Sequence, residues 1–456
     1  MSGISHQLAS VKADGSRLPI FPSDVQGRFI TGRRIVFWAL IGFYVLAPVL
    51  HLGKHALVHL DVDARRFYLF GQTFNAQDAW LLVLLLASAV FSLLLVTTWR
   101  GRVWCGWACP QTVFVEAIFR PIERLIEGPR ERRMRALKEP LTAGGVVRKV
   151  LKHTGYLLAS LALAHVAVAL FIPREELGGM IADGPWAHPV AFVWTMAITG
   201  LAYFDFGWFR EQFCVVMCPY GRLQSVMHDR DSVIVGYDLK RGEPRGQLKK
   251  AGFGDCIDCK KCVTACPTAI DIRDGLQMEC VACAQCADAC DRVMDKIGKP
   301  RGLIRYASMN ELDGKGRKVL RPRLAVYAAL STVFAGAFTA AIVLRKPFEA
   351  NVLRLPGPPY VLDEGRIRNG LFVHLVNKSP ERRTYWVKAE GPDGAEVKVE
   401  PSQVELGSLE STQVSVVAWL PRANWQKGMH VEVHVEQDDG THREQDVPFV
   451  GPLLPH

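Results

Sequence analysis

Residues 256–291 read CIDCKKCVTACPTAIDIRDGLQMECVACAQCADACD and hold eight of the 12 cysteines of the chain. They form two runs of four, each spaced Cys-x2-Cys-x2-Cys-x3-Cys. This spacing is typical of domains with two 4Fe-4S clusters, in which three thiolates of a run bind one cubane and the fourth binds the other. The predicted ligand sets are Cys256, Cys259, Cys262 and Cys290 for one cluster, and Cys280, Cys283, Cys286 and Cys266 for the other.

A pair of zinc sites is the alternative, because four thiolates also suit Zn²⁺. Zinc ribbons do not need the third and fourth cysteine at this spacing in two successive runs, so iron is favoured. Lys260, Lys261 and Lys296 lie near the runs. They either dock an acidic electron donor or, as the simpler interpretation, only solvate the surface.

The chain has 456 residues, of which 49% are hydrophobic, and apolar stretches alternate with charged segments. This pattern excludes an ordinary soluble enzyme. Five segments are each close to the ~20 residues that cross a bilayer. They are residues 35–52, 79–98, 154–172, 189–209 and 324–344. The sequence predicts a polytopic α-helical membrane protein, with four spans within residues 35–210 and the fifth within 322–345.

Lys and Arg are distributed unevenly between the short loops. Residues 1–34 hold 5 and the loop 99–153 holds 12, against 3 in 53–78 and 1 in 173–188. The positive-inside rule therefore places the N-terminal tail and the basic loop in the cytoplasm. Five crossings then put the ferredoxin-like segment 211–321 inside. This topology explains the net charge of +10 more simply than a nucleic-acid-binding surface does.

The first span follows a polar tail without a small-residue cleavage signature, so we expect an uncleaved anchor. Beyond the last span, residues 350–456 alternate apolar and polar side chains in short runs separated by turn signals such as Asp439-Gly440. Six or seven strands in about 100 residues predict an all-β, immunoglobulin-like sandwich outside the membrane. It serves either as a docking module or as a stabilising cap.

The remaining four cysteines form two Cys-x3-Cys-Pro motifs, WCGWACP at 104–110 and FCVVMCP at 213–219. If each motif is helical, its two sulfurs lie on one face, one turn apart. A cysteine at a membrane edge is usually just a small apolar residue, but the doubled spacing favours a function. Four thiols could bind Cu(I), cycle through disulfides or border another redox group. The candidate catalytic or copper-binding residues are Cys105, Cys109, Cys214 and Cys218.

The motifs CGWACP and CVVMCPYG, the run at 256–291 and the following GKPRGLIRYASMNEL stand in the order known from the CcoG family, also called FixG or RdxA. The chain resembles this family over essentially its whole length. The resemblance implies a ferredoxin-type accessory factor of cbb3-type cytochrome oxidase in the bacterial inner membrane, with a periplasmic C-terminal domain. It also implies reduction of Cu(II) to Cu(I) during oxidase assembly, with copper as substrate or transient ligand.

Two other functions stay open. Related four-span proteins with paired motifs resemble quinol dehydrogenases, for which His165 and Asp205 would be candidates for quinone protonation. A non-enzymatic assembly scaffold or copper chaperone is the third hypothesis. No Gly-rich dinucleotide fingerprint follows a predicted strand, so a bound nicotinamide or flavin is not supported. Expected partners are a cytoplasmic electron donor, copper-delivery and oxidase assembly proteins, and membrane lipid, with a homo-oligomer left open.

His51, His55 and His59 follow the first span at positions i, i+4 and i+8. A helix that continued past the membrane would place all three on one face, where a pair could bind Cu(II) or zinc through imidazole nitrogens. Interfacial histidines whose rings tolerate the headgroup region are the alternative.

Overall fold

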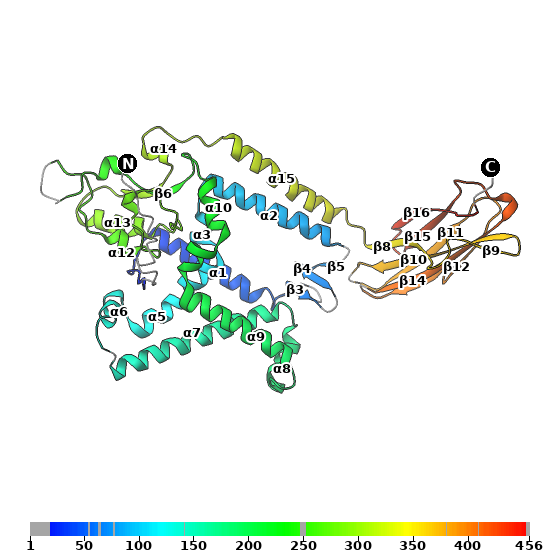
Figure 1. Ribbon diagram of the computed structural model, residues 1–456, viewed down its shortest axis with the longest axis horizontal. Coiled ribbons are helices and arrows are strands. Elements are labelled where there is room, and N and C mark those ends of the chain that lie inside the picture. The colour runs from blue at the N-terminus through cyan, green and yellow to red at the C-terminus, as the bar shows by residue number, and fades with distance from the viewer. Residues whose placement is uncertain are drawn as a thin grey trace. The chain divides into compact units, whose positions relative to one another are not determined.

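The computed structural model describes residues 19–452 apart from 53–54, 63–64, 76–77, 141, 247–251, 380 and 409. The chain divides into two compact units, Met1–Thr339 and Ala340–His456. The first unit contains the long helices and the cysteine-rich domain, and the second contains a β-sandwich (Figure 1). Each unit has its own hydrophobic core.

The described part of the first unit contains five long helices. They are α1 (Arg28–Leu46), α2 (Ala79–Arg100), α7 (Ala143–Ala169), α9 (Pro189–Ala202), which continues as the π-helix η3 (Tyr203–Phe209), and α15 (Pro322–Val343). Four stretches, Arg28–Leu46, Trp80–Arg100, Pro189–Phe209 and Pro322–Val343, are long and apolar enough to cross a membrane. Large apolar side chains on them face outward, as Trp38 and Val83 do. The predicted polytopic α-helical membrane protein is confirmed.

The third predicted span, 154–172, lies mostly in α7. This helix has 27 residues, enough to cross a bilayer at about 1.5 Å per residue, but it is less apolar than the other four. In the first half of α7, His153 Nδ1 bonds Tyr203 OH at 2.7 Å, and just beyond the end of α7 Leu170 O accepts from Leu60 N at 2.7 Å. It lines a groove together with α9, and its crossing of the membrane stays a prediction.

Short strands follow α1 in place of the continued helix that would align the three histidines. They are β1 (His51–Leu52), β2 (His55–Ala56), β3 (Val58–Asp61), β4 (Arg66–Leu69) and β5 (Gln72–Asn75). β1 pairs with β2, and β3, β4 and β5 form an antiparallel meander. A helix with His51, His55 and His59 on one face, which the metal hypothesis needs, does not form, because Pro48 lies just past the end of α1 and cannot continue it.

The two histidines of this segment whose side chains are described have other contacts. His51 Nδ1 donates to Val49 O at 2.9 Å. His59 is buried and stacks on Tyr68, with ring centroids 5.7 Å apart. The side chain of His55 lies outside the described part of the chain. The spacing of the three histidines therefore does not support a copper site on the outer side of the membrane.

Short helices connect the long ones near the cysteine-rich domain. They are α3 (Val103–Trp107), α4 (Pro110–Phe114), η2 (Val115–Phe119), α5 (Arg120–Glu127), α6 (Arg130–Ala136), η4 (Phe213–Met217) and α10 (Pro219–Met227), while α8 (Arg174–Asp183) joins α7 to α9. The segments η2, η3 and η4 are π-helices. This form is rare and occurs often at functional sites. All three lie within a few residues of a Cys-x3-Cys-Pro motif.

The cysteine-rich domain is built from short elements around two loops. They are β6 (Ile234–Tyr237), α11 (Leu239–Gly242), α12 (Lys261–Ala265), the 3-10 turn η5 (Ile272–Asp274), α13 (Gln285–Lys296), β7 (Ile304–Ala307) and α14 (Met309–Leu312). β6 pairs with β7 antiparallel. A core of Val235, Ile272, Met294, Leu303 and Ile304 surrounds buried cysteines. The cysteines therefore lie in an apolar interior, where a cluster is shielded from water.

Helix α1 is held to this domain through its first turn. The backbone N–H groups of Phe29 and Ile30 donate to the Asp288 carboxylate of α13 at 3.2 and 2.8 Å. A negative charge at a helix N-terminus satisfies free N–H groups and favours the helix dipole. A Cβ on Gly27 would lie 2.4 Å from Asp288 Oδ1, so this approach requires glycine.

The second unit is an antiparallel sandwich, as predicted. Its strands are β8 (Phe348–Arg354), β9 (Val361–Asp363), β10 (Arg366–Asn377), β11 (Arg383–Glu390), β12 (Glu396–Glu400), β13 (Gln403–Leu406), β14 (Ser411–Pro421), β15 (His430–Gln437) and β16 (His442–Pro448), with the 3-10 turn η6 (Arg422–Asn424) after β14. One sheet has the order β12-β14-β10-β8 with β9 on β10, and the other β13-β11-β15-β16. Alternate residues of β10 and β14 are buried between the sheets.

Candidate functional site

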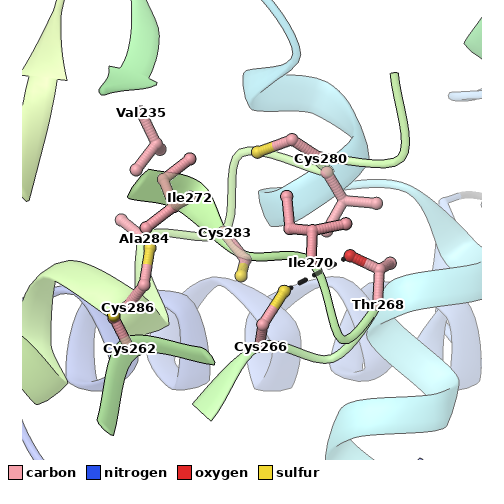
Figure 2. A pocket seen from close by; sticks show the side chains of 11 residues that line it. Val235, Cys262, Cys266, Thr268, Ile270, Ile272, Cys280, Cys283, Ala284 and Cys286 are labelled. Atoms are coloured by element: carbon pink, nitrogen blue, oxygen red, sulfur yellow. Dashed lines mark hydrogen bonds between the residues drawn. The ribbon is translucent and has the colours of Figure 1, made fainter. Parts of the chain in front are cut away.

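Two cysteine-lined cavities lie in the cysteine-rich domain. Figure 2 shows the first, around which Cys262, Cys266, Cys280, Cys283 and Cys286 lie with Val235, Ile270 and Ile272. The second is lined by Cys256, Cys259, Cys262 and Cys290, with Tyr237, Met294 and Leu303. Each cavity thus gathers all four cysteines of one predicted ligand set.

The fourth cysteine of each run reaches the cavity of the other run. Cys290 lines the cavity of the first run, and Cys266 lines the cavity of the second. Cys262 borders both, so the cavities are neighbours. Among the described residues, no group of three His, Cys, Asp or Glu side chains is placed to bind a single metal ion. The crossed arrangement, in which the fourth cysteine of each run lines the cavity of the other run, fits a pair of cubanes.

Burial makes these thiols weak acids in the absence of a cation. It raises the pKa of Cys262 and Cys280 to about 12 and that of Cys283 to about 11. Protonated thiols in an apolar cavity give up their protons when a cationic group binds. The chemistry of the cavities thus suits iron–sulfur clusters, which are held by thiolates.

The two loops that wrap the cavities repeat one backbone conformation. Asp258 and Lys260 have φ of 50° and 54°, and the equivalent Ala282 and Ala284 have φ of 52° and 57°. Residues other than glycine rarely adopt this left-handed region, at a cost of roughly 1–2 kcal/mol each. Strain of this kind persists where a functional geometry requires it. Of these residues only Asp258 is of a type enriched in this region, so the sequence gives little indication of the conformation.

The Cys-x3-Cys-Pro motifs are not single helices. Cys105 lies in α3 and Cys214 in η4, but Cys109 and Cys218 are extended residues before helices that begin at Pro110 and Pro219. The expectation of two sulfurs one turn apart on one helix is therefore wrong. Proline disfavours the helical conformation in the residue before it, so each motif bends at its second cysteine.

Hydrogen bonds join the two motifs. Cys105 Sγ donates to Gln224 Oε1 on α10 at 3.4 Å, and Arg102 donates to Gly221 O at 2.5 Å. Gln111 Nε2 of α4 donates to Arg210 O at 2.9 Å. The structure thus brings Cys105, Cys109, Cys214 and Cys218 into one region at the membrane edge. Sequence reasoning did not identify Arg102 or Gln224.

This region touches the first cavity. A Cβ on Gly106 would lie 2.6 Å from Val281 O and 2.9 Å from Ala282 O, between two cysteines of the cavity. Arg102 also donates to Met278 O in the same loop. A smaller pocket beside the motifs is lined by Gln111, Cys214, Thr268 and Val281. The segment that holds Cys105 and Cys109 is therefore in direct contact with the Cys280–Cys283 loop through Gly106.

A buried network of charges lies beside the second motif. Arg210 and Arg133 pair with Glu123 at 3.2 and 3.0 Å, and Arg120 pairs with Glu116 and Glu211. Burial opposes ionisation of Glu123, but the two arginines outweigh it and lower its pKa. The network fixes η2 and α5 against the chain that follows η3, so it positions the thiols.

His165 and Asp205, the two candidates for quinone protonation, have different hydrogen-bond partners. His165 Nδ1 donates to Leu161 O of its own helix at 2.8 Å. Asp205 accepts from Gln111 Nε2 at 3.1 Å. Neither lines the open apolar groove between α7 and α9, which His153, Tyr203 and Thr199 border.

Curated relatives match most of the chain. Protein RdxB of Cereibacter sphaeroides is 41% identical over 393 residues, which cover 81% of this chain and 82% of the relative. Nitrogen fixation protein FixG of Rhizobium meliloti is 35% identical over 485 residues, with 94% and 92% covered. The chain belongs to the FixG/RdxA/RdxB family. Protein RdxA of Cereibacter sphaeroides, 36% identical with 85% of each chain covered, extends the match.

Three family descriptions match separate parts of the chain. Residues 209–309 match a 4Fe-4S dicluster domain and residues 79–129 a 4Fe-4S binding domain. Residues 338–452 match the IG-like fold at the C-terminus of FixG, whose description proposes an oxidoreductase. A crystal structure of a FixG-related protein from Vibrio parahaemolyticus is 12% identical, with a TM-score of 0.22, and covers 24% of this chain and 100% of its own. The chain is thus an iron–sulfur membrane protein of this family.

Proposed function

We propose that this protein carries electrons from a cytoplasmic donor to Cu(II), and that the Cu(I) produced serves assembly of a cbb3-type cytochrome oxidase. The observation that carries the proposal is the contact of Gly106 with the Cys280–Cys283 loop. It places the membrane-edge thiols next to a cavity lined by cluster-type cysteines. We name copper as the acceptor because the family resemblance implies it and because Cu(I) prefers thiolate ligands.

The surface near Cys259 is suited to receive electrons. Cys259 is exposed, unlike Cys256 and Cys262 of the same set, and exposed Lys260 and Lys261 follow it. Such a surface attracts an acidic donor by charge. When bound, the clusters supply one-electron redox chemistry. Cys262, which borders both cavities, holds the two sites adjacent.

The helix directions support a cytoplasmic position for the cysteine-rich domain. α1 starts beside Asp288 of that domain, and α15 starts beside Arg321, which bonds Thr98 O near the end of α2. Helix α7 ends beside β3, which follows the far end of α1. Alternating directions of this kind are those of five crossings. Together with the positive-inside rule they support our proposal that the domain lies on the cytoplasmic side.

The reaction needs one electron per copper. Each Cu²⁺ takes one electron from the reduced protein and becomes Cu⁺, while the donor is oxidised by one electron. No bond to a leaving group is broken. Cu⁺ prefers soft thiolate ligands, so the region of Cys105, Cys109, Cys214 and Cys218 favours the product.

A quinone is the second candidate acceptor, and one feature favours it. The open groove between α7 and α9 is lined by the apolar Val146, Val150, Leu157 and Met196 as well as by polar residues. The hydrogen-bonded pair of His153 and Tyr203 borders it. An apolar groove with a proton-exchanging pair at the membrane edge suits a quinone ring.

An anaerobic acceptor test distinguishes these functions. The full chain is purified in detergent, reduced, freed of excess reductant and mixed with Cu(II) or with a soluble quinone, while cluster absorbance is recorded. We expect Cu(II) to reoxidise the protein and form Cu(I) in proportion to the electrons stored. Reoxidation by quinone alone would support the quinol function, and reoxidation by neither would support a scaffold. The variant His153→Phe should leave the copper reaction unchanged.

A further inference from the structure

Arg33 of α1 is fixed beside the cysteines of the first cavity. Its Nε donates to Gly106 O at 2.8 Å, and Gly106 touches the Cys280–Cys283 loop. With the Gln285 amide turned so that both of its polar groups are bonded, its oxygen accepts from Arg33 Nη1 at 2.8 Å. Gln285 directly precedes Cys286, another ligand of that cavity. The guanidinium group of Arg33 thus lies close to two segments that carry these ligands.

The charge of Arg33 is buried and has no ion pair among the described residues. Arg33 is 1% exposed, and its Nη2 atom has no hydrogen-bond partner there. Glu116 lies nearby, but Arg120 bonds its carboxylate at 2.5 Å and, more than Arg33, outweighs the effect of burial and lowers its pKa. An unpaired buried cation is costly, so an anion is expected beside Arg33. A cluster bound to four thiolates is such an anion.

Arg102, directly before α3, is a second buried cation at this loop. It is 8% exposed, and its guanidinium group donates to Met278 O and Cys280 O. A third hydrogen bond runs to Gly221 O at 2.5 Å. All of its hydrogen-bond partners in the described part of the chain are carbonyl oxygens, so no carboxylate is bonded to it. The loop of the first cavity therefore has two buried positive charges beside it.

The arginine at the second cavity is neutralised. Arg273 lines that cavity and pairs with Asp258 at 2.5 Å and with Asp271 at 2.6 Å. Buried Asp291, directly after Cys290, adds a third carboxylate on that side. The exposed lysines near this cavity are screened by water and salt. The buried charges thus differ between the cavities, positive beside the first and paired or negative beside the second.

Buried charge of this kind decides where an electron rests. Reduction adds a negative charge to a cluster that its thiolates already make anionic, so a cation nearby favours the reduced state. The effect is strong in an apolar interior, where water screens little. Burial alone acts in the opposite direction, because it disfavours the more highly charged form. Since Cys259 of the second cavity is exposed and the cysteines of the first are largely buried, an electron would stay at the second cavity without the arginines.

We infer that Arg33 and Arg102 raise the reduction potential at the first cavity above that at the second. Electrons that enter beside Cys259 then collect beside Gly106 and the membrane-edge thiols. The step moves one electron: the second cavity's site is oxidised by one electron, the first cavity's site is reduced by one, and no bond or proton is exchanged. The inference rests on the two clusters of the proposed function and holds whichever acceptor follows them.

A redox titration of the full chain tests the inference. Protein purified anaerobically in detergent is poised at a series of potentials with mediators, and electron paramagnetic resonance measures the reduced form at each cavity. The signals are assigned by their change in Cys283→Ser for the first cavity and in Cys259→Ser for the second. In the wild type we expect the first cavity's signal to appear at the higher potential.

Removal of either charge should reverse this preference. Arg33→Met and Arg102→Met should each lower the ratio of reduced to oxidised form at the first cavity at least tenfold at a fixed potential, which is about 59 mV for a one-electron couple. The second cavity should titrate as in the wild type. Arg33→Lys keeps the charge and should restore most of the difference. The matched control Arg230→Met, which removes an exposed arginine just before β6, should shift neither signal.

Iron content and the size-exclusion profile show whether each variant keeps its fold. Should one Met variant lose its iron, the other variant and the order of reduction in the wild type still decide. Earlier reduction of the second cavity in the wild type would overturn the inference, as would unchanged potentials in the Met variants. An equal shift in Arg33→Lys and Arg33→Met would also overturn it, because it would indicate a structural role. Failure to reduce Cu(II) with the expected order of potentials would contradict the proposed function alone.

Discussion

Gly106 lies where α3 meets the Cys280–Cys283 loop, and no larger residue fits there without a shift. The contacting atoms are carbonyl oxygens of Val281 and Ala282, which cannot move as a flexible side chain does. Arg33 Nε donates to Gly106 O at 2.8 Å from α1, so three segments meet at this residue. Because Gly106 has no side chain, α3 can approach the loop of the first cavity this closely.

The variant Gly106→Val should separate α3 from the loop. We expect it to keep the iron of the two cavities, to lose about 1–3 kcal/mol of stability from overpacking, and to slow Cu(I) formation by at least tenfold. Cu(I) is measured with a chelating dye after anaerobic reduction of the protein. Gly42→Ala is the matched control, because a Cβ at Gly42 meets nothing within 4 Å. Equal rates in both variants would show that the contact does not serve electron transfer.

Charge reversal at Lys260 and Lys261 should weaken reduction by an acidic donor. Both side chains are exposed beside Cys259, so the double variant Lys260→Glu/Lys261→Glu should keep its iron. With an acidic ferredoxin as donor, we expect the reduction rate to fall about tenfold at low salt and the difference to shrink at high salt. The control Lys398→Glu lies in the β-sandwich and should have no effect. A salt-independent rate would place the donor elsewhere.

At the scale of elements, the sequence predicts the individual segments better than it predicts the contacts between them. The cysteine spacing in 256–291 and the apolar stretches show which segments bind clusters and which cross the membrane, because both signals are local. The bend at Cys109 and Cys218 was missed, although Pro110 and Pro219 signal it. The contact of Gly106 with Val281 and the cap of α1 by Asp288 join residues more than 170 positions apart, and no local pattern encodes them.

The variant Asp288→Ala should loosen α1 from the cysteine-rich domain. It removes the acceptor of the Phe29 and Ile30 N–H groups, so we expect a loss of about 1–2 kcal/mol. Thermal unfolding followed by cluster absorbance measures this loss as a lower midpoint. Asp295→Ala, on the exposed side of the same helix, is the control. An unchanged midpoint in Asp288→Ala would show that the cap does not stabilise the domain.

At the scale of the whole molecule, the two units depend on different forces. The first unit combines apolar helices with a cysteine-rich domain, whose interior we expect to be filled by the clusters that its thiols bind. The second has a continuous apolar core between two sheets, including Ile367, Val373, Tyr385 and Val433, and contains no cysteine. The alternation of residues in 350–456 predicted this sandwich because its core follows a period of two.

Residues 340–456 should therefore fold without the rest of the chain. We expect a soluble β-rich domain with cooperative, two-state unfolding and no bound iron, measured by circular dichroism and metal analysis. The variant Val373→Asp, which places a charge in the core, should abolish cooperative unfolding. A non-cooperative wild-type fragment would mean that the sandwich needs the membrane unit.

The central claim is that the eight ferredoxin-type cysteines form two crossed sets, because the order of electron transfer depends on it. Electron paramagnetic resonance of the reduced full chain with single Cys→Ser variants tests this most directly. Cys259→Ser and Cys290→Ser, from different runs, should alter one and the same signal, and Cys283→Ser and Cys266→Ser should alter the other. If Cys290→Ser instead alters the signal that Cys283→Ser alters, the sets do not cross and the account is contradicted.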